Sequence, residues 1–153
     1  PIRFTKWALR PDSGGPGKNR GGCGAIYEIE LLEEKADAFL FGERGKFGPP
    51  GIVGGGKGAL NKFSYPDGSG GETSPPMVSK MVGIHLDQGQ RIRLETPGGG
   101  GYGNALERDP AAVAEDVRLG YVSVQAAADS YKCSISKDGV LDSKETDRMR
   151  RKP

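Results

Sequence analysis

The sequence has few of the residues that most often carry catalysis and metal binding. Its 153 residues include one histidine, His85, and two cysteines, Cys23 and Cys133. There is no CxxC pair and no HExxH motif, so the usual patterns of structural zinc sites and zinc peptidases are missing. Two separated thiols are too few for a disulfide scaffold and fit a reducing compartment. We therefore expect a cytoplasmic protein that binds no metal itself.

The sequence also lacks long apolar runs and a strong net charge. Hydrophobic residues make up 35% of the chain, and no run is long enough for a membrane span or a signal peptide. The 22 basic and 20 acidic residues leave a net charge of +2, too balanced for a nucleic-acid-binding face. The one basic cluster, Asp147–Pro153, is better explained as a solvated terminus. Neither a nucleic-acid partner nor a membrane partner is expected.

Glycine is the residue that the chain has in excess. With 26 glycines and 11 prolines, these two types supply about a quarter of the residues, close to the level of low-complexity segments. The glycines, however, gather between periodic apolar runs, which favours a folded β-rich domain with long loops. A small core supports long irregular loops poorly, so we expect these loops to pack against a partner surface.

Alternation of apolar and polar residues predicts several strands in the first 96 residues. In Tyr27–Leu31 the apolar side chains alternate with two glutamates, as in a half-buried strand. The clearest strand is Arg91–Thr96, with Ile92 and Leu94 directed inward. Further strands are expected in residues 2–9 and 36–45, at the start of 62–76, and before the turn at 87–90.

After residue 108 the pattern becomes helical. Asp109 is placed to cap a helix that begins at Pro110 and ends at Gly120, and Ser123 is placed to cap a second one. The predicted fold is therefore mainly β with long glycine-rich loops, followed by two short helices, a β-rich α+β class. We divide the chain into a β-rich region (1–108), a helical segment (109–131), and a polar turn and tail (132–153) that is either frayed or held by a partner.

Two glycine motifs resemble nucleotide-binding loops but lack the required context. Gly98, Gly100 and Gly103 satisfy G-x-G-x-x-G, yet Pro97 interrupts the strand exit and the helix signal begins only at Asp109. The segment "GIVGGGK" satisfies the first part of a P-loop. It then has glycine where Ser or Thr would bind magnesium, and neither a buried strand before it nor a helix after it is expected. Both nucleotide sites are disfavoured.

The loop from residue 10 to residue 24 is basic and glycine-rich, which allows two interpretations. Its amides and cationic side chains could hold an anion, or Arg10, Asp12 and Arg20 could tie the loop down through charge-assisted hydrogen bonds. We favour the second interpretation.

No catalytic constellation is evident in the sequence. Ser13, Cys23 and His85 are the imaginable nucleophiles and base, but there is no nucleophile elbow and no second histidine. Catalytic residues are therefore expected to be absent from this chain.

Taken as a set, the glycine loops resemble the C-terminal portion of hydantoinase B family proteins. The segments that carry the resemblance are "LRPDSGGPGKNRGGCG", "GIVGGGKGA" and "ETPGGGGYGNALERDP", followed by the helical segment "VAEDVRLGYVSVQAAADSY". Together they cover roughly Arg3 to Tyr131. The family includes B subunits of N-methylhydantoinases, part of 5-oxoprolinases, and large subunits of acetone and acetophenone carboxylases. Family members are usually several times longer than this chain.

The resemblance implies the small subunit of an acetophenone carboxylase-type complex, with the hydantoinase B part split between two polypeptides. Pro1 would suit removal of an initiator methionine, and a fragment of a longer chain is the alternative. In such a complex a partner subunit activates a carbonyl or amide substrate by phosphorylation, and the complex then carboxylates or hydrolyses it. The resemblance thus implies ATP, Mg or Mn and bicarbonate for the whole complex, with no cofactor held by this chain.

We therefore expect an accessory subunit of an ATP-dependent ketone carboxylase, in a hetero-oligomer with larger hydantoinase A- and B-like subunits. An ATP-dependent hydantoinase or oxoprolinase complex is the alternative, and a free-standing scaffold or ligand-binding module is the alternative from another class. Gly99 and Gly100 are expected to need either positive φ or close backbone approach. The candidate interface or loop-anchoring residues are Arg10, Asp12, Arg20, Lys57, Gly98, Gly99, Gly100, Gly101 and Tyr102.

Overall fold

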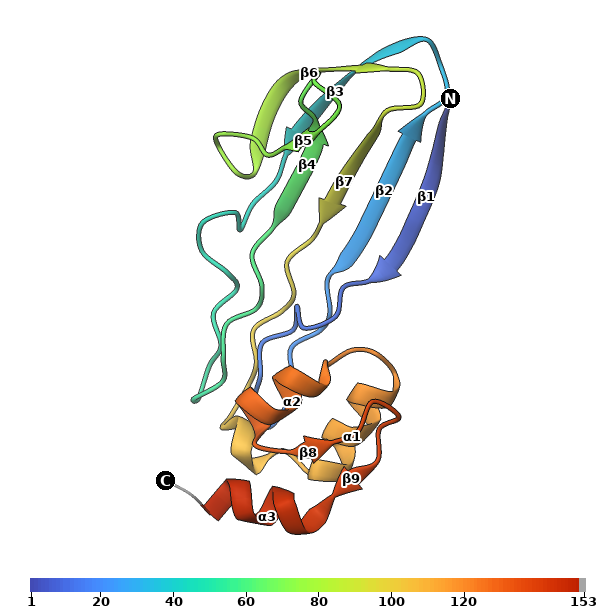
Figure 1. Cartoon of the computed structure of the whole chain (residues 1–153). Coiled ribbons are helices and arrows are strands. Elements are labelled where there is room, and N and C mark those ends of the chain that lie inside the picture. Colours follow the sequence, from blue (N-terminus) through green and yellow to red (C-terminus); the bar gives the residue numbers. More distant parts are fainter. Residues whose placement is uncertain (152–153) are drawn as a thin grey trace.

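The computed structural model describes residues 1–151 and is elongated, with strands at one end and helices at the other (Figure 1). Extended segments outside the sheets and helices connect the two ends. The predicted α+β class, strands first and short helices last, is confirmed. Within residues 1–151 no helix combines the length and the apolar character needed to cross a membrane.

A five-stranded antiparallel sheet forms the upper end. Three adjacent strands place apolar residues on one face and mostly charged residues on the other, so this part of the sheet has one apolar face and one charged face. Its strands, in spatial order, are β1 (Ile2–Leu9), β2 (Ala25–Leu31), β7 (Arg91–Glu95), β4 (Lys62–Pro66) and β5 (Glu72–Thr73).

A second, two-stranded sheet covers part of the apolar face. It consists of β3 (Lys35–Phe41) paired antiparallel with β6 (Lys80–Asp87). The two layers share a core made of the buried side chains Leu31, Leu40, Phe63, Ile84 and Leu86. The cover stops short of the outer strand β1, where Phe4 and Trp7 remain 48% and 68% exposed. The sandwich is therefore closed on one side and open on the other.

The helical end has its own closed core, made of Val113, Ala114, Val117, Val122, Ala127, Tyr131, Cys133 and Ile135. Asp109 accepts a hydrogen bond from the Ala111 amide and Ser123 accepts one from Ala126, as the capping pattern predicted. Gly120 adopts a φ of 73° just after the first helix. The elements are the 3₁₀ turn η1 (Ala105–Glu107), α1 (Pro110–Arg118), α2 (Val124–Tyr131), β8 (Ser134–Ile135), β9 (Leu141–Asp142) and α3 (Ser143–Arg151).

The helix α3 lies in the segment expected to be a polar turn and tail. Its residues show no apolar stripe from which a helix could be predicted. Polar contacts hold it in place instead. Thr146 is 1% exposed and accepts a hydrogen bond from the Ser134 amide. Arg150 donates to the Tyr131 and Arg108 carbonyls. The last two residues of the expected tail lie outside the described residues.

Candidate interaction surfaces around a glycine bundle

Five extended segments run side by side between the sheet and the helices (Figure 1). We call them the glycine bundle. Hydrogen bonds between their main chains replace both the ladder of a sheet and the turns of a helix. The segments span residues 13–17, 19–24, 49–52, 55–59 and 97–103.

The segment 97–103 lies at the centre of the bundle and is bonded to all four others. Gly99 and Gly101 each donate one hydrogen bond and accept another, so the main-chain groups of the segment are used in several directions. The bonds run from Gly15 N–H to Gly99 O (2.8 Å), Gly99 N–H to Gly22 O (2.9 Å), Gly101 N–H to Gly56 O (2.9 Å) and Ile52 N–H to Gly101 O (3.0 Å).

This central position explains three of the four consecutive glycines, whereas a Cβ added to Gly99 would have no atom closer than 3.3 Å. A Cβ atom added to Gly98 would lie 1.9 Å from the Ser13 carbonyl oxygen, and one on Gly100 would lie 1.9 Å from the Pro50 carbonyl oxygen. Residues 98–101 all have φ outside the left-handed region. Close backbone approach therefore explains the requirement for glycine, and positive φ does not.

The glycines of the bundle also show a three-residue spacing. Members of each pair face neighbouring main chain at contact distances that leave no room for a side chain. A polyproline II helix has three residues per turn and no internal hydrogen bonds, and this spacing matches its period. The pairs are Gly21 with Gly24, Gly55 with Gly58, and Gly98 with Gly101.

The same hydrogen bonds bear on the phosphate-loop interpretation of residues 98–103. A phosphate cradle needs main-chain amides that point to a common empty space. The amides of Gly99 and Gly101 instead donate to carbonyls of neighbouring segments. This segment therefore serves as the axis of a packed bundle.

Arg10 is buried where the bundle meets the sheet. Its Nη1 donates to the carbonyls of Leu60 (2.7 Å) and Thr96 (3.0 Å), and its Nε lies 3.1 Å from Oε2 of Glu95. The Arg10 side chain thus joins three chain segments at the edge of the sheet: its own loop after β1, the segment before β4 and the segment after β7.

Asp12 and Arg20 lie at the opposite end of the bundle, against the helices. The carboxylate of Asp12 accepts a hydrogen bond from the Ser123 amide at 2.7 Å. Arg20 holds both carboxylate oxygens of Asp116 at 3.2 Å, and its guanidinium lies 5.4 Å from the centre of the Tyr121 ring. Burial lowers the pKa of Arg20, but the hydrogen bond and charge of Asp116 outweigh it and leave that pKa raised.

Lys57 and Tyr102 are exposed members of the predicted set, as are Asp12 and Gly99. Among residues 1–151, Lys57 makes no ion pair. Tyr102 exchanges both main-chain hydrogen bonds with Asn19 at 2.9 Å and is 48% exposed, so its ring lies at the bundle surface.

The imagined nucleophiles and base occupy separate structural roles. The buried Ser13 hydroxyl donates to the Arg10 carbonyl and accepts from the Gly24 amide, which fixes a bundle turn. His85 lies on β6 beside Asp37 of β3, on the exposed side of the two-stranded sheet. The residues that the structure describes contain no cluster of three His, Cys, Asp or Glu side chains that could hold a metal ion.

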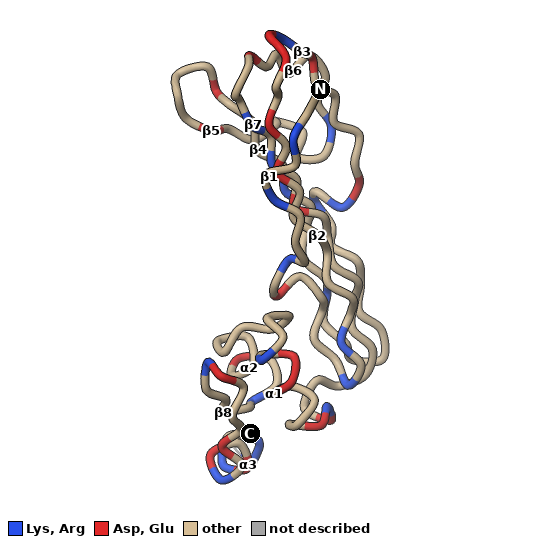
Figure 2. The backbone as a smooth tube through the Cα atoms, turned by 90° about the vertical axis from the view of Figure 1, so that its right-hand side faces the viewer, with Lys and Arg blue, Asp and Glu red and all other residues tan. Residues whose placement is uncertain are grey.

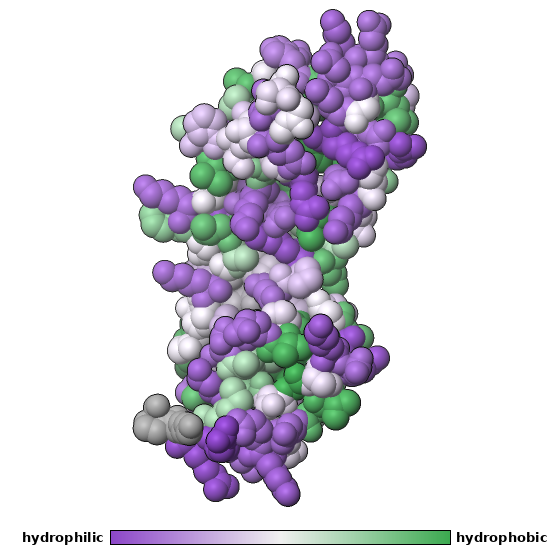
Figure 3. All heavy atoms as spheres, in the orientation of Figure 1, coloured by the Kyte–Doolittle hydropathy of each residue, from purple (hydrophilic) through white to green (hydrophobic). Residues whose placement is uncertain are grey.

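An apolar groove lies on the open side of the sandwich. It has a volume of about 350 Å³ and lies between β1–β2 and β3. Phe4 and Trp7 pack with ring centres 5.0 Å apart, and Trp7 meets Tyr27 edge-on at 4.7 Å. Figure 3 shows hydrophobic residues along the edge where Figure 1 places β1. We call this surface the aromatic groove and define it by Phe4, Trp7, Tyr27, Phe39 and Ile92.

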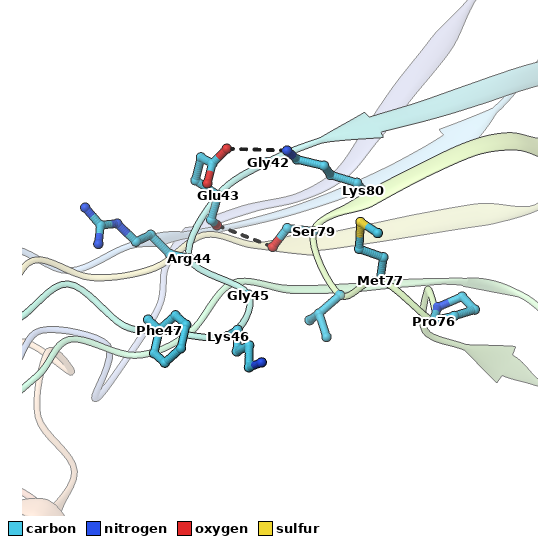
Figure 4. A pocket seen from close by; sticks show the side chains of 11 residues that line it. Gly42, Glu43, Arg44, Gly45, Lys46, Phe47, Pro76, Met77, Ser79 and Lys80 are labelled. Atoms are coloured by element: carbon cyan, nitrogen blue, oxygen red, sulfur yellow. Dashed lines mark hydrogen bonds and ion pairs between the residues drawn. The ribbon is translucent and has the colours of Figure 1, made fainter.

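A second groove of about 770 Å³ lies between the loops 42–47 and 76–80 (Figure 4). Its floor is fixed because the Ser79 hydroxyl accepts from Asn61 and donates to the Glu43 carbonyl. Its rim carries the exposed side chains of Phe47 and Met77. The groove is open and mixed in character, and Figure 2 shows that charges of both signs are interspersed at each end of the molecule.

The sequence profile of the hydantoinase B/oxoprolinase family matches residues 1–105. The chain belongs to this family. It is 32% identical to the B-type subunit of a putative D-/L-hydantoinase from a Pseudomonas species, over 99% of this chain and 25% of the relative. It is also 32% identical to the beta chain of the caprolactamase from Pseudomonas jessenii, over 93% of this chain and 25% of that protein. The sequence resemblance is thereby confirmed at the level of the family.

Two solved structures share the fold of this member of the hydantoinase B family. The nucleotide-free acetone carboxylase superposes with a TM-score of 0.74 at 25% identity, over 98% of this chain and 24% of the larger one. The ATP-dependent caprolactamase of Pseudomonas jessenii gives a TM-score of 0.76 at 29% identity, over 98% and 26%. The chain thus spans about a quarter of the length of each of these relatives.

Proposed function

We propose that this chain is an accessory, structural part of an ATP-dependent enzyme complex and completes a larger hydantoinase B-like polypeptide. The acetone carboxylase and the caprolactamase are ATP-dependent enzymes, and the chain matches about a quarter of the protein compared in each case. The partners we propose are larger hydantoinase A- and B-like subunits.

The open aromatic groove is the observation that carries this proposal. Phe4 and Trp7 lie on the face that elsewhere forms the core, yet they remain 48% and 68% exposed. Covering two such rings is worth on the order of 5 kcal/mol at about 25 cal/mol per Å² of apolar area. A partner that completes the second layer of the sandwich would gain this free energy.

For the reaction of the complex, we propose carboxylation of a ketone of the acetone or acetophenone type. The shared fold with acetone carboxylase supports this choice. ATP, Mg or Mn and bicarbonate would be bound by the partner subunits. Hydrolysis of a cyclic amide is the second candidate, favoured by the 32% identity and the TM-score of 0.76 with the caprolactamase of Pseudomonas jessenii.

Co-expression with the larger subunits, followed by native purification, tests the accessory role. We expect this chain to co-purify with them and ATP-dependent turnover to be lost in a complex assembled without it. Normal turnover without the chain, together with a stable lone monomer, would contradict the proposal.

The substrate class needs a second assay on the same complex. ATP hydrolysis that depends on bicarbonate plus acetophenone or acetone supports carboxylation. ATP hydrolysis that depends on hydantoin or caprolactam, without bicarbonate, supports the amide hydrolase instead.

A further inference from the structure

We propose that β1 accepts an additional β-strand from a partner chain, and that this strand alternates apolar with acidic residues. The inference rests on the accessory role proposed above, because it specifies the chemistry of a partner segment that would extend the sheet beside the aromatic groove. Three features of β1 carry it: a free main-chain edge, an apolar inner face and a cationic outer face.

The main-chain edge of β1 is unpaired within residues 1–151. β1 is the outermost of five strands, is eight residues long and pairs only with β2. The Arg10 amide donates to the Gly24 carbonyl at the end of the ladder. Along an antiparallel strand, the N–H and C=O groups of successive residues point to opposite sides. Since Arg10 bonds toward β2, the N–H and C=O groups of Leu9 and Trp7 point away from β2. These groups can pair with a further strand.

A β-bulge gives β1 a continuous apolar inner face. The register shifts between Phe4 and Lys6, so that Trp7 lies opposite Tyr27 on the same face as Phe4. Edge strands that stay free usually carry an inward-facing charge or a proline. The inner face of β1 has neither; its members are all apolar and 48% to 68% exposed. They are Ile2, Phe4, Trp7 and Leu9.

The outer face predicts the charge of the added strand. Columns of opposite sign alternate across the sheet, with Arg91 and Arg93 on β7, Glu28 and Glu30 on β2, and Arg3 and Lys6 on β1. Neighbouring columns are joined by ion pairs, such as Arg3 with Glu30 at 2.9 Å and Arg91 with Glu30 at 3.3 Å. Lys6 makes no ion pair with any described residue. The next column would therefore be acidic, since opposite charges on facing strands attract.

The same charges disfavour a second copy of this chain as the occupant. An antiparallel pair of two β1 strands would place Arg3 and Lys6 of one copy against the cations of the other. Like charges directly opposite one another are destabilising. The occupant that fits is an extended segment of a hydantoinase B-like partner, with apolar residues toward the groove and Asp or Glu toward Lys6.

The single tryptophan makes the inference directly measurable, because Trp7 fluorescence reports on this surface alone. The probes are two heptapeptides without aromatic residues, one alternating valine with glutamate and the other valine with lysine. We expect a saturable change in emission with the glutamate peptide and about tenfold weaker binding of the lysine peptide. The Trp7 and Leu9 amides should exchange more slowly in the bound state, because strand addition uses their main-chain groups.

Charge reversal provides the matched test. Lys6→Glu should weaken binding of the glutamate peptide about threefold or more, as expected for one cross-strand pair. Lys137→Glu changes the same charge at an exposed site near the helical end and should have no effect. Equal binding of both peptides, or no binding and no amide protection, would overturn the proposal. A concentration-dependent dimer in sedimentation that shifts Trp7 emission would also overturn it, in favour of a second copy.

The assembled complex separates this inference from the accessory role. If the larger subunits bind this chain and the Trp7 and Leu9 amides become protected, both proposals hold. If the complex forms while these amides exchange as in the free chain, strand addition is wrong and the accessory role survives. If no complex forms, the accessory role fails regardless of what the peptides do.

Discussion

The sheet end and the glycine bundle are held together in opposite ways. The sheet end depends on side chains: Phe63, Ile84 and Leu86 are nearly completely buried between two layers, and one side of the same apolar face is left open. The bundle depends on the absence of side chains, because its main chains lie so close that a Cβ would collide with a neighbouring carbonyl. The first arrangement can adapt to a partner, whereas the second can only keep its shape. The bundle therefore acts as a stiff link between an open sheet and a closed helical core.

The largest effect should come from a methyl group placed at the centre of the bundle. Gly100→Ala puts a Cβ 1.9 Å from the Pro50 carbonyl oxygen, in a segment that is hydrogen-bonded to the four others of the bundle. We expect a loss of more than about 4 kcal/mol in unfolding free energy, or failure to fold. Thermal or urea unfolding measures this loss.

Neighbouring glycines supply graded controls for the same change. A Cβ on Gly99 would lie 3.3 Å from the Gly22 amide nitrogen, so Gly99→Ala should cost less than about 1 kcal/mol. Gly22 has no atom within 4 Å of such a Cβ, and Gly22→Ala should be neutral. Equal stability of all three variants would mean that close approach is not what holds the bundle. If Gly100→Ala instead left assembly intact and abolished ATP binding by the complex, the nucleotide interpretation would return.

The next largest effect on the unfolding free energy should distinguish the covered half of the sheet from the open half. Phe63 is 5% exposed, and Phe63→Ala should cost about 3–5 kcal/mol in the free chain. Trp7 is 68% exposed, so Trp7→Ala should cost the free chain less than about 1 kcal/mol.

In binding to the larger subunits, Trp7→Ala should have a larger effect than its small effect on the stability of the free chain. Trp7→Ala should weaken co-purification with the larger subunits more than any other exposed substitution on β1, such as Thr5→Ala. A Trp7→Ala chain that assembles normally would show that the aromatic groove is not the docking surface.

The junction between bundle and helices should show an intermediate effect. Asp116 is the common partner of Arg20 and Arg108, which are 3.2 Å and 2.8 Å from its Oδ2, and its side chain is 9% exposed. Asp116→Asn leaves two largely buried cations without their anion and should cost about 3 kcal/mol. Glu115→Gln, which removes an exposed pair with Arg118, should cost less than about 0.5 kcal/mol. Similar losses in urea unfolding for the two variants would refute a special role for Asp116.

The features of the fold that depend on local chemistry could be predicted from the sequence. Strand alternation in Tyr27–Leu31, the caps Asp109 and Ser123, and the terminating Gly120 depend on local chemistry and were predicted. The glycine loops were recognised as a set, but the spacing of three between Gly98 and Gly101, a signal that could have predicted their packing, was not used.

The remainder depends on contacts that a linear pattern does not encode. The bulge after Phe4 changes the alternation of β1, so strict alternation from Ile2 and Phe4 would put Trp7 on the opposite face, whereas the structure puts it on the same one. The partner of Arg20, Asp116, lies 96 residues away along the chain. The helix α3 is held by Thr146 and Arg150 through polar contacts that leave no apolar period.

The smallest effect concerns the charged face of the sheet, whose ion pairs contrast with the main-chain hydrogen bonds of the bundle. Hydrogen bonds from Thr5 and Arg93 lower the pKa of Glu28, and a hydrogen bond and charge from Arg3, aided by Arg91, lower that of Glu30. Both groups have their ordinary pKa near 4.5. A folded-state pKa below the unfolded value adds stability above the unfolded pKa, and this stability is lost as the pH falls through the folded pKa.

Unfolding midpoints should therefore decrease as the pH falls from about 5 to about 3, because both carboxylates are partly exposed and lose their cations gradually. The double substitution Glu28→Gln and Glu30→Gln should reduce this dependence, whereas Glu72→Gln on the short strand β5 should leave it largely unchanged. Since the bundle is held by main-chain bonds that do not titrate, amide exchange at Gly99 and Gly101 should remain slow in this pH range after correction for the intrinsic rate. A bundle that opens before the sheet on acidification would show that its stiffness depends on the charged residues at its two ends, Arg10 and Arg20, more than on the close packing of its main chains.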